Sequence, residues 1–293
     1  KDLPKKEIIE TQIEETTVIQ EKPIKLSIVG RPNVGKSSLI NKIIDQDRLI
    51  VSEQAGTTRD IVEIPFHWNK KSFILLDTAG LKKSYKNDQG ADYYAAIRSM
   101  KAIKETDVVM VLLSAEDPLS RQDKRIIKQA VDANKPLLIF INKWDLMDTE
   151  NQYAKKDMKQ IVISNFTQLE NNPILIGSTK DKVGINTLFE NCIAVYEASK
   201  RRIATGDLNR FVNRIIQKNP PRGKSSKRQL KIYYATQAEI APPHFIFFIN
   251  HVEKISKTYE RYVEKQIREY LDPFFGTPIK ITFKPHREKK EKK

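Results

Sequence analysis

Between residues 25 and 199, short apolar runs alternate with longer amphipathic stretches. The apolar runs predict six strands, at 25–29, 61–67, 72–77, 107–113, 136–141 and 173–177. Several of these runs are apolar at every position, which is typical of strands covered on both faces. Helical spacing of apolar residues lies between them, at 36–44, 91–105, 120–133, 151–169 and 185–199. The alternation predicts a three-layer α/β domain with a mostly parallel sheet, which binds ligands at the carboxyl ends of its strands.

After residue 200 the order of elements changes. A helix with one apolar face begins near Asp207, a candidate N-cap, and ends before Pro220 and Pro221. Two short strands, a second helix and a last strand follow, at 229–236, 245–250, about 256–271 and 279–283. This α-β-β-α-β order predicts a small α+β domain. The expected divisions are a linker or tail at 1–22, the α/β domain at 23–199, the small domain at 200–285 and a basic tail at 286–293.

The net charge of +15 belongs almost entirely to the last third of the chain. Residues 200–293 hold 23 Lys and Arg against 9 Asp and Glu, and a surface of this kind favours polyanions. No apolar run approaches the roughly 20 residues that span a bilayer, so we expect no association with a membrane. The single cysteine, Cys192, excludes an internal disulfide framework and is expected in a helix core. We therefore expect a protein of the reduced cytoplasm.

Residues 30–37 read Gly-Arg-Pro-Asn-Val-Gly-Lys-Ser, a phosphate-loop pattern (GxxxxGKS) between a predicted strand and a predicted helix. Its glycines let consecutive N–H groups point at a polyphosphate, and the start of the helix adds the positive end of its dipole. Lys36 is expected to bridge the outer phosphates, and Ser37 to offer its hydroxyl to Mg²⁺. The alternative is a chance glycine-rich turn. The candidate nucleotide-binding residues of the loop are Asn33, Val34, Gly35, Lys36, Ser37 and Ser38.

Two tetrapeptides close later strands. In Asp77-Thr78-Ala79-Gly80, the Asp77 carboxylate can hold Mg²⁺ through water, and the Gly80 N–H can meet the γ-phosphate. In Asn142-Lys143-Trp144-Asp145, the Asp145 carboxylate can accept hydrogen bonds from guanine N1–H and N2–H₂. Adenine lacks this donor pair and would leave the carboxylate unpaired. Asn142 is expected to tie this loop to the phosphate loop, and the stem of Lys143 to cover the base. Together the three motifs predict a guanine-nucleotide domain.

Three further segments refine this prediction. The stretch Gly56-Thr57-Thr58-Arg59-Asp60 is a candidate switch, in which Thr58, or alternatively Thr57, would complete the Mg²⁺ shell only with the γ-phosphate present. Ser178 and Thr179 follow the last strand, where a backbone N–H would meet guanine O6. Leu81 stands where Ras-like proteins carry the glutamine that orients the attacking water. A binding-only domain with negligible turnover is therefore an alternative to a hydrolase.

Asn33 in the phosphate loop, combined with the Gly-Thr-Thr-Arg-Asp switch, resembles the TrmE–Era–Der group of GTPases. That resemblance implies a K⁺ ion where an arginine finger would lie, held by Asn33 and by backbone carbonyls around 52–55, and it favours slow hydrolysis stimulated by K⁺. The catalytic residues it implies are Lys36, Asn33, Thr58 and Gly80.

The chain from Lys25 to Phe283 is similar to the second GTPase domain and C-terminal KH-like domain of the Der (EngA) family of ribosome-assembly GTPases. The likeness is carried by the phosphate loop, by Gly-Thr-Thr-Arg-Asp-Ile, Asp-Thr-Ala-Gly-Leu-Lys-Lys and Asn-Lys-Trp-Asp, by Tyr259-x-x-Tyr262 and by the ending 276–284. It implies a switch that uses GTP/GDP, Mg²⁺ and K⁺ and docks on the large (50S) ribosomal subunit and its rRNA during assembly. Members carry two tandem GTPase domains, so it also implies a C-terminal fragment whose missing first GTPase domain is an intramolecular partner.

The small domain differs from ordinary KH domains, which clamp a single strand with a Gly-x-x-Gly loop. No such sequence occurs after residue 200, which counts against an Era-type GTPase of the small subunit. The domain could still meet rRNA backbone through charge, or it could pack against GTPase domains and sense their state. We interpret the Tyr and Ile stripe on its helices as core. The basic residues available for RNA are Arg201, Arg202, Arg210, Arg214, Lys224, Lys227 and Arg228.

Overall fold

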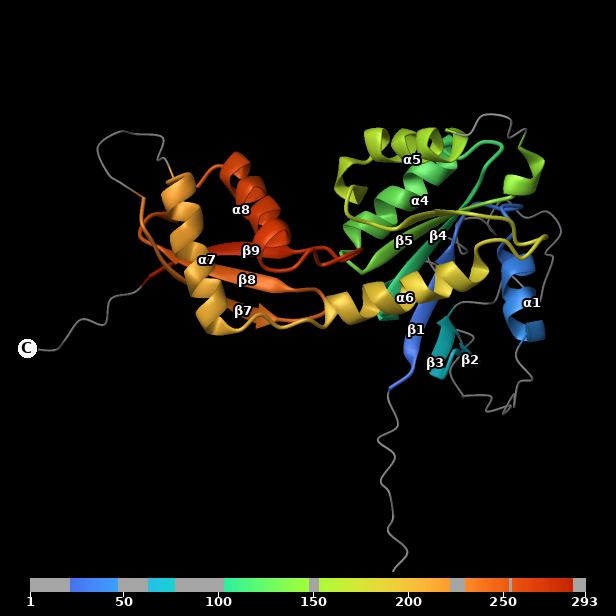
Figure 1. Ribbon diagram of the computed structural model, residues 1–293, viewed down its shortest axis with the longest axis horizontal. Helices are drawn as coiled ribbons and strands as arrows, with labels where there is room; N and C mark the ends of the chain where they lie inside the picture. Colours follow the sequence, from blue (N-terminus) through green and yellow to red (C-terminus); the bar gives the residue numbers. More distant parts are fainter. Residues whose placement is uncertain are drawn as a thin grey trace, which may run out of the picture.

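The computed structural model of this chain describes residues 22–46, 63–76, 103–147, 153–221, 230–252 and 255–286. Its larger sheet has six strands in the order β2-β3-β1-β4-β5-β6 (Figure 1). All neighbouring strands are parallel except β2 and β3, which form an antiparallel pair. The predicted, mostly parallel sheet is therefore confirmed. The strands are β1 (Ile24–Val29), β2 (Glu63–Trp68), β3 (Lys71–Leu76), β4 (Val108–Ser114), β5 (Leu137–Asn142) and β6 (Ile174–Ile176).

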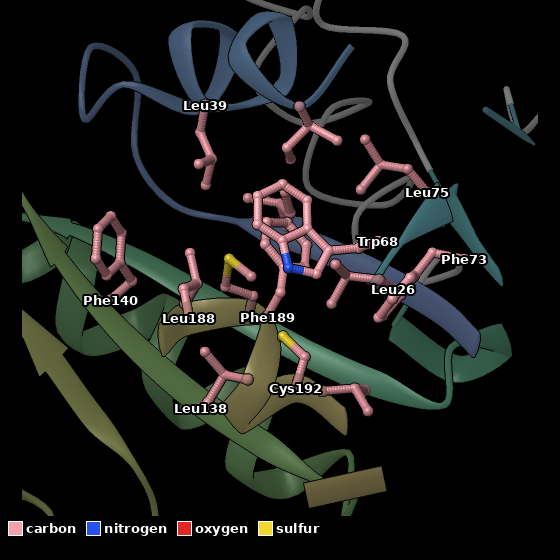
Figure 2. Packing of buried hydrophobic residues seen from close by; sticks show 14 of the residues in the cluster. Leu26, Leu39, Trp68, Phe73, Leu75, Leu138, Phe140, Leu188, Phe189 and Cys192 are labelled. Atoms are coloured by element: carbon pink, nitrogen blue, oxygen red, sulfur yellow. The ribbon is translucent and has the colours of Figure 1, made fainter. Parts of the chain in front are cut away.

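Helices cover both faces of this sheet, which explains the continuous apolar runs. β4 and β5 are buried at every position. One face packs against α1 (Lys36–Gln46) and α6 (Ile185–Ser199), the other against α4 (Arg121–Asp132) and α5 (Ala154–Asn165). Figure 2 shows the first of these cores, where α6 inserts Phe189 against strand side chains and Cys192 is fully buried, as predicted for this cysteine. The ring of Phe189 stacks on Trp68, with centroids 4.5 Å apart.

The helix predicted over 151–169 is shorter than expected. It ends at Asn165 because Phe166 leaves the helical conformation, and a separate 3₁₀ turn, Thr167–Leu169, follows. Of the helix predicted over 91–105, only 103–105 lie among the described residues, and these are helical. Within the described ranges, no helix has the length and apolarity needed to cross a bilayer.

The last third of the chain forms a second, three-stranded sheet with the predicted α-β-β-α-β order. The helices α7 (Thr205–Lys218) and α8 (Lys257–Tyr270) pack on one face of β7 (Ile232–Glu239), β8 (His244–Ile249) and β9 (Lys280–Pro285). β7 and β8 are antiparallel, and β8 and β9 are parallel. The helix stripe predicted to be core is core, since Tyr259, Val263 and Ile267 are buried. The N-cap prediction was wrong: α7 is capped by Ala204, and Asp207 lies in its first turn, paired with Arg210.

A loop after α8 joins the two sheets. Gly276 accepts a hydrogen bond from the Leu137 N–H (2.8 Å) at the start of β5, and its own N–H donates to the Asn171 carbonyl (2.8 Å). Thr277 adds a bond from its hydroxyl to the carbonyl of Val195 in α6 (3.3 Å). Gly276 has a φ of +64°, and a Cβ there would lie 2.4 Å from Cγ2 of Val195. The contact therefore requires glycine for both backbone conformation and space.

We expect Gly276→Ala to lower the free energy of unfolding by about 2–4 kcal/mol, because it combines left-handed strain with overpacking. Urea denaturation followed by circular dichroism measures this change. Gly206→Ala is the matched control: Gly206 is exposed in the first turn of α7, where a new Cβ would meet only Arg210, at 3.7 Å. The control should change stability by about 1 kcal/mol or less. Equal effects of the two substitutions would contradict the role assigned to Gly276.

Candidate functional site

The phosphate loop connects β1 to α1 at the carboxyl end of the larger sheet, and two glycines allow its path. A Cβ at Gly30 would lie 2.4 Å from the Leu112 carbonyl oxygen, and one at Gly35 would lie 2.2 Å from Nδ2 of Asn142. Gly35 also has a φ of +102°, and Asn33 has a φ of +66°. Because Asn tolerates this region better than most residues, the loop can hold the tight turn that an anion-binding backbone needs.

Lys36 begins α1 and folds back over the loop. Its ammonium donates hydrogen bonds to the carbonyls of Gly30 (2.8 Å) and Arg31 (2.7 Å). Burial lowers the pKa of Lys36 from its ordinary value, and the negative charge of Asp123 opposes that shift. The loop thus holds a partly desolvated cation beside its turn, where attraction to a phosphate is stronger than in bulk water.

A second ion pair anchors the loop to α4. The Arg31 Nε lies 3.0 Å from the Asp123 carboxylate, which is completely buried, and an Arg31 NH₂ group donates to the Asp117 carbonyl (2.9 Å). Ser120, the N-cap of α4, donates its hydroxyl to the same carboxylate (2.7 Å). Burial raises the pKa of Asp123, against opposing contributions from Ser120 and Arg31. This anchor was missed from the sequence, although Ser120-x-x-Asp123 fits a helix-start pattern related to the capping box.

Asn142 connects the phosphate loop to the loop after β6. Its side-chain amide is buried and donates to the Val34 carbonyl (2.9 Å). Its carbonyl oxygen accepts two bonds from Thr179, one from the backbone N–H and one from the hydroxyl, each 2.9 Å long. The bond to Val34 is the contact predicted between the Asn142 loop and the phosphate loop, whereas the two bonds from Thr179 were not predicted. One side chain fixes the distance between the turn of the phosphate loop and Thr179.

Asp145 lies beside this junction, in the 3₁₀ turn that follows β5. Ser178 donates its hydroxyl to the Asp145 carboxylate (2.6 Å), and the Lys180 ammonium lies 3.9 Å from the other carboxylate oxygen. The hydrogen bond from Ser178 is the main cause that lowers the pKa of Asp145. The carboxylate is therefore ionised at neutral pH and acts only as an acceptor. It is suited to a partner that presents parallel N–H donors.

Lys143 has a left-handed backbone, with a φ of +64°. Its ammonium lies 3.0 Å from the Glu116 carboxylate, and this hydrogen bond is the largest cause that lowers the pKa of Glu116. The pair fixes the Lys143 stem, which was proposed to cover a base. Glu116 was also missed from the sequence, because an acidic residue just after a strand has no motif of its own.

The structure thus brings Lys36, Asn142, Lys143, Asp145, Ser178 and Thr179 to one edge of the sheet. Ser37 and Ser38 lie exposed at the start of α1, beside the turn. The other predicted site residues, Thr58, Asp77 and Gly80, lie outside the described residues, and so do Leu81 and the carbonyls assigned to K⁺. Within the described part of the chain, no group of three His, Cys, Asp or Glu side chains could hold a metal. Among the described residues, the hard hydroxyl oxygen of Ser37 fits Mg²⁺ together with phosphate oxygens.

Comparisons with known proteins agree with this arrangement. Residues 25–143 match the family described as "50S ribosome-binding GTPase", and residues 202–284 match "KH-domain-like of EngA bacterial GTPase enzymes, C-terminal". GTPase Der of Staphylococcus carnosus is 40% identical over 269 residues, covering 92% of this chain and 61% of the relative. GTPase Der of Brevibacillus brevis is 41% identical over 258 residues, covering 88% of this chain and 58% of the relative. The chain therefore spans about three fifths of the length of these curated relatives.

Proposed function

Because the chain belongs to the Der (EngA) family of GTPases, we propose that it is a GTP-hydrolysing switch that acts in the cytoplasm in assembly of the large ribosomal subunit. Nucleotide binding is supported above all by the hydrogen bonds of Asn142. They hold the phosphate loop and the Ser178–Thr179 segment at a fixed spacing. A ligand held at both places must carry a polyphosphate at one end and a base at the other.

Each contact at this site has a matching group on GTP. The loop N–H groups and Lys36 bind the phosphates, and the Asp145 carboxylate accepts hydrogen bonds from guanine N1–H and N2–H₂. Ser178 holds that carboxylate ionised, so adenine would leave it without donors. Ser37 supplies a hydroxyl for Mg²⁺, and Thr58 and Asp77 are assigned the remaining metal contacts by sequence alone.

We assign hydrolysis to electrostatic stabilisation of the phosphates, since Leu81 cannot orient water. Asn33 lies exposed at the turn of the loop, and its carboxamide oxygen is a suitable ligand for a monovalent cation. A K⁺ ion held there would supply positive charge against the phosphates, where other GTPases use an arginine. The competing function is a nucleotide-controlled RNA-binding module with negligible turnover.

We expect phosphate release from GTP to be about 100-fold faster in KCl than in NaCl of equal ionic strength, the lower end of the range for one electrostatic contact in a transition state. Asn33→Gly should abolish most of this difference, because it removes the carboxamide while glycine keeps the positive φ. Its affinity for GDP, measured by calorimetry, should stay close to that of the unmodified chain. Absence of turnover in either salt, with GTP bound, would favour the competing function.

The smaller domain offers a basic groove as its contact with RNA. The groove has a volume of about 560 Å³ and lies between the start of α7 and the end of α8. Three arginines line it, Arg202, Arg210 and Arg214, and Asp207 is the one carboxylate among its lining residues. Arg214 stacks on the Tyr270 ring, 3.8 Å from its centroid. Guanidinium groups held this way suit phosphate oxygens of an RNA backbone.

Other basic residues of the small domain differ in their surroundings. Arg201 forms an ion pair with Asp272 outside the groove lining, so part of its charge is already compensated. Lys218 donates to the Tyr270 hydroxyl (3.2 Å), and this bond is the largest cause that lowers the pKa of Tyr270. Lys224, Lys227 and Arg228 lie outside the described residues. The proposal for RNA contact therefore rests on the groove arginines, Arg202, Arg210 and Arg214, of which Arg210 is itself paired with the exposed Asp207.

We expect the chain to co-sediment with large ribosomal subunits more strongly with a GTP analogue than with GDP, with binding that weakens steeply as salt rises. Arg210→Ala combined with Arg214→Ala should weaken binding and flatten the salt dependence, because fewer counterions are released. Lys124→Ala with Arg125→Ala, on exposed positions of α4, removes the same charge from the other domain and is the matched control. Equal binding in both nucleotide states would exclude a switch, and equal loss in both double variants would exclude the groove.

A further inference from the structure

A cluster of aromatic side chains lies at one corner of the smaller sheet, away from the groove of arginines. We call it the aromatic corner, and it comprises Tyr233 and Tyr234 of β7, Phe248 of β8 and His286 after β9. Tyr234 stacks on Phe248 with centroids 4.5 Å apart, and Tyr233 stacks on His286 at 4.4 Å. His286 also meets the Tyr234 ring edge to face, at 5.8 Å, so the four rings form one group.

The register of the strands explains why these rings face outward. Tyr234 pairs with Phe248, and Phe248 pairs with Lys284, so the three side chains share one face of the sheet. Their neighbours Ala235 and Phe247 point to the opposite face, into the core under α7 and α8. The outward face at this corner is therefore the one that the two helices do not cover.

A β-bulge adds a second tyrosine. The register of β7 against β8 shifts between Ile232, which is buried in the core, and Tyr234. Two consecutive residues, Tyr233 and Tyr234, consequently remain 37% and 40% exposed instead of alternating between core and solvent. The bulge therefore leaves two neighbouring rings available to a ligand at the surface, where Tyr is a common contact residue.

The charge around the corner is positive. Lys231 lies 5.1 Å from the centroid of the Tyr233 ring, and Lys284 stands in the same row as Phe248. In the sequence, segment 222–229 precedes β7 and segment 287–293 follows His286, and together they hold nine Lys and Arg against two Glu. Exposed aromatic rings flanked by cations are the two components that bind single-stranded nucleic acid, through base stacking and through phosphate attraction.

We propose that the aromatic corner is a base-stacking platform for unpaired nucleotides of RNA. The inference rests on the proposed contact with rRNA and deepens it. The arginine groove would bind the RNA backbone by charge. The aromatic corner would select strands whose bases are free to stack. A double helix keeps the faces of its bases stacked inside and exposes phosphates, 2′-hydroxyls and base edges, so it offers this corner no free base face. The ring stacks already restrain the tyrosines, which reduces the entropy lost when a base binds.

The test uses the complete 293-residue chain and a short, fluorescently labelled, single-stranded oligouridine, with a blunt-ended RNA duplex of equal length for comparison. Tyr234→Ala should weaken binding of the single strand about tenfold, as expected for loss of one stacked base, and should leave duplex binding nearly unchanged. Tyr234→Phe should retain the affinity, because the ring remains. Tyr153→Ala, which removes an exposed tyrosine of the larger domain, is the control for general effects.

Photo-crosslinking of the unmodified chain to RNA that contains 5-iodouracil gives a readout independent of folding in the variants. We expect crosslinks to Tyr233, Tyr234 or His286. Crosslinks confined to other segments, or an affinity of Tyr234→Ala equal to that of the unmodified chain, would overturn the inference. The arginine double variant could lose subunit binding while Tyr234→Ala leaves oligouridine binding unaffected. That result would refute the platform and leave the proposed function intact. Failure of the unmodified chain to bind oligouridine would also refute the platform, whereas the proposed function is judged on ribosomal subunits.

Discussion

The buried carboxamide of Asn142 is the contact on which the site depends. It is the last residue of a strand buried at every position, and it bonds to the Val34 carbonyl and to both donors of Thr179. These groups are 108 and 37 residues away in the sequence. Removal of the amide would leave one acceptor, the Val34 carbonyl, and two donors, the N–H and hydroxyl of Thr179, without these partners, at a cost of about 1–3 kcal/mol for each buried group that stays unpaired. The same contact explains Gly35, since any Cβ there would collide with the Asn142 amide.

The strand that carries Asn142 also reaches the second domain. Its first residue, Leu137, donates to the Gly276 carbonyl, so β5 has the proposed nucleotide site at one end and the interdomain contact at the other. The strand has six residues, so roughly 16 Å of extended chain separates the interdomain contact from the proposed nucleotide site. This fully buried strand connects the small domain to the proposed nucleotide site. It does not itself supply the two alternative arrangements that a switch needs.

Local sequence patterns predicted most of the fold and part of the site. The continuous apolar run over 107–113 identified β4, and the phosphate loop was placed correctly between a strand and a helix. Contacts between distant segments could not be predicted. The Arg31–Asp123 anchor joins residues 92 apart, and the bulge that exposes Tyr233 depends on strand register. The prediction of Asp207 as the N-cap was wrong, because Asp is common both at the N-cap and in the first turn of a helix, so the sequence does not separate the two positions. The roles of Thr58, Asp77 and Gly80 stay predictions.

Calorimetric titration of GDP into the unmodified chain and into Asn142→Ala tests the central claim, that one amide holds a guanine-nucleotide site together. We expect the substitution to reduce GDP affinity at least about tenfold, since one or more buried groups lose their partners. Asn191→Ala is the matched control, because its amide bonds only to Thr187 on the exposed side of α6, and it should bind GDP like the unmodified chain. A folded Asn142→Ala variant with unchanged GDP affinity would contradict the account.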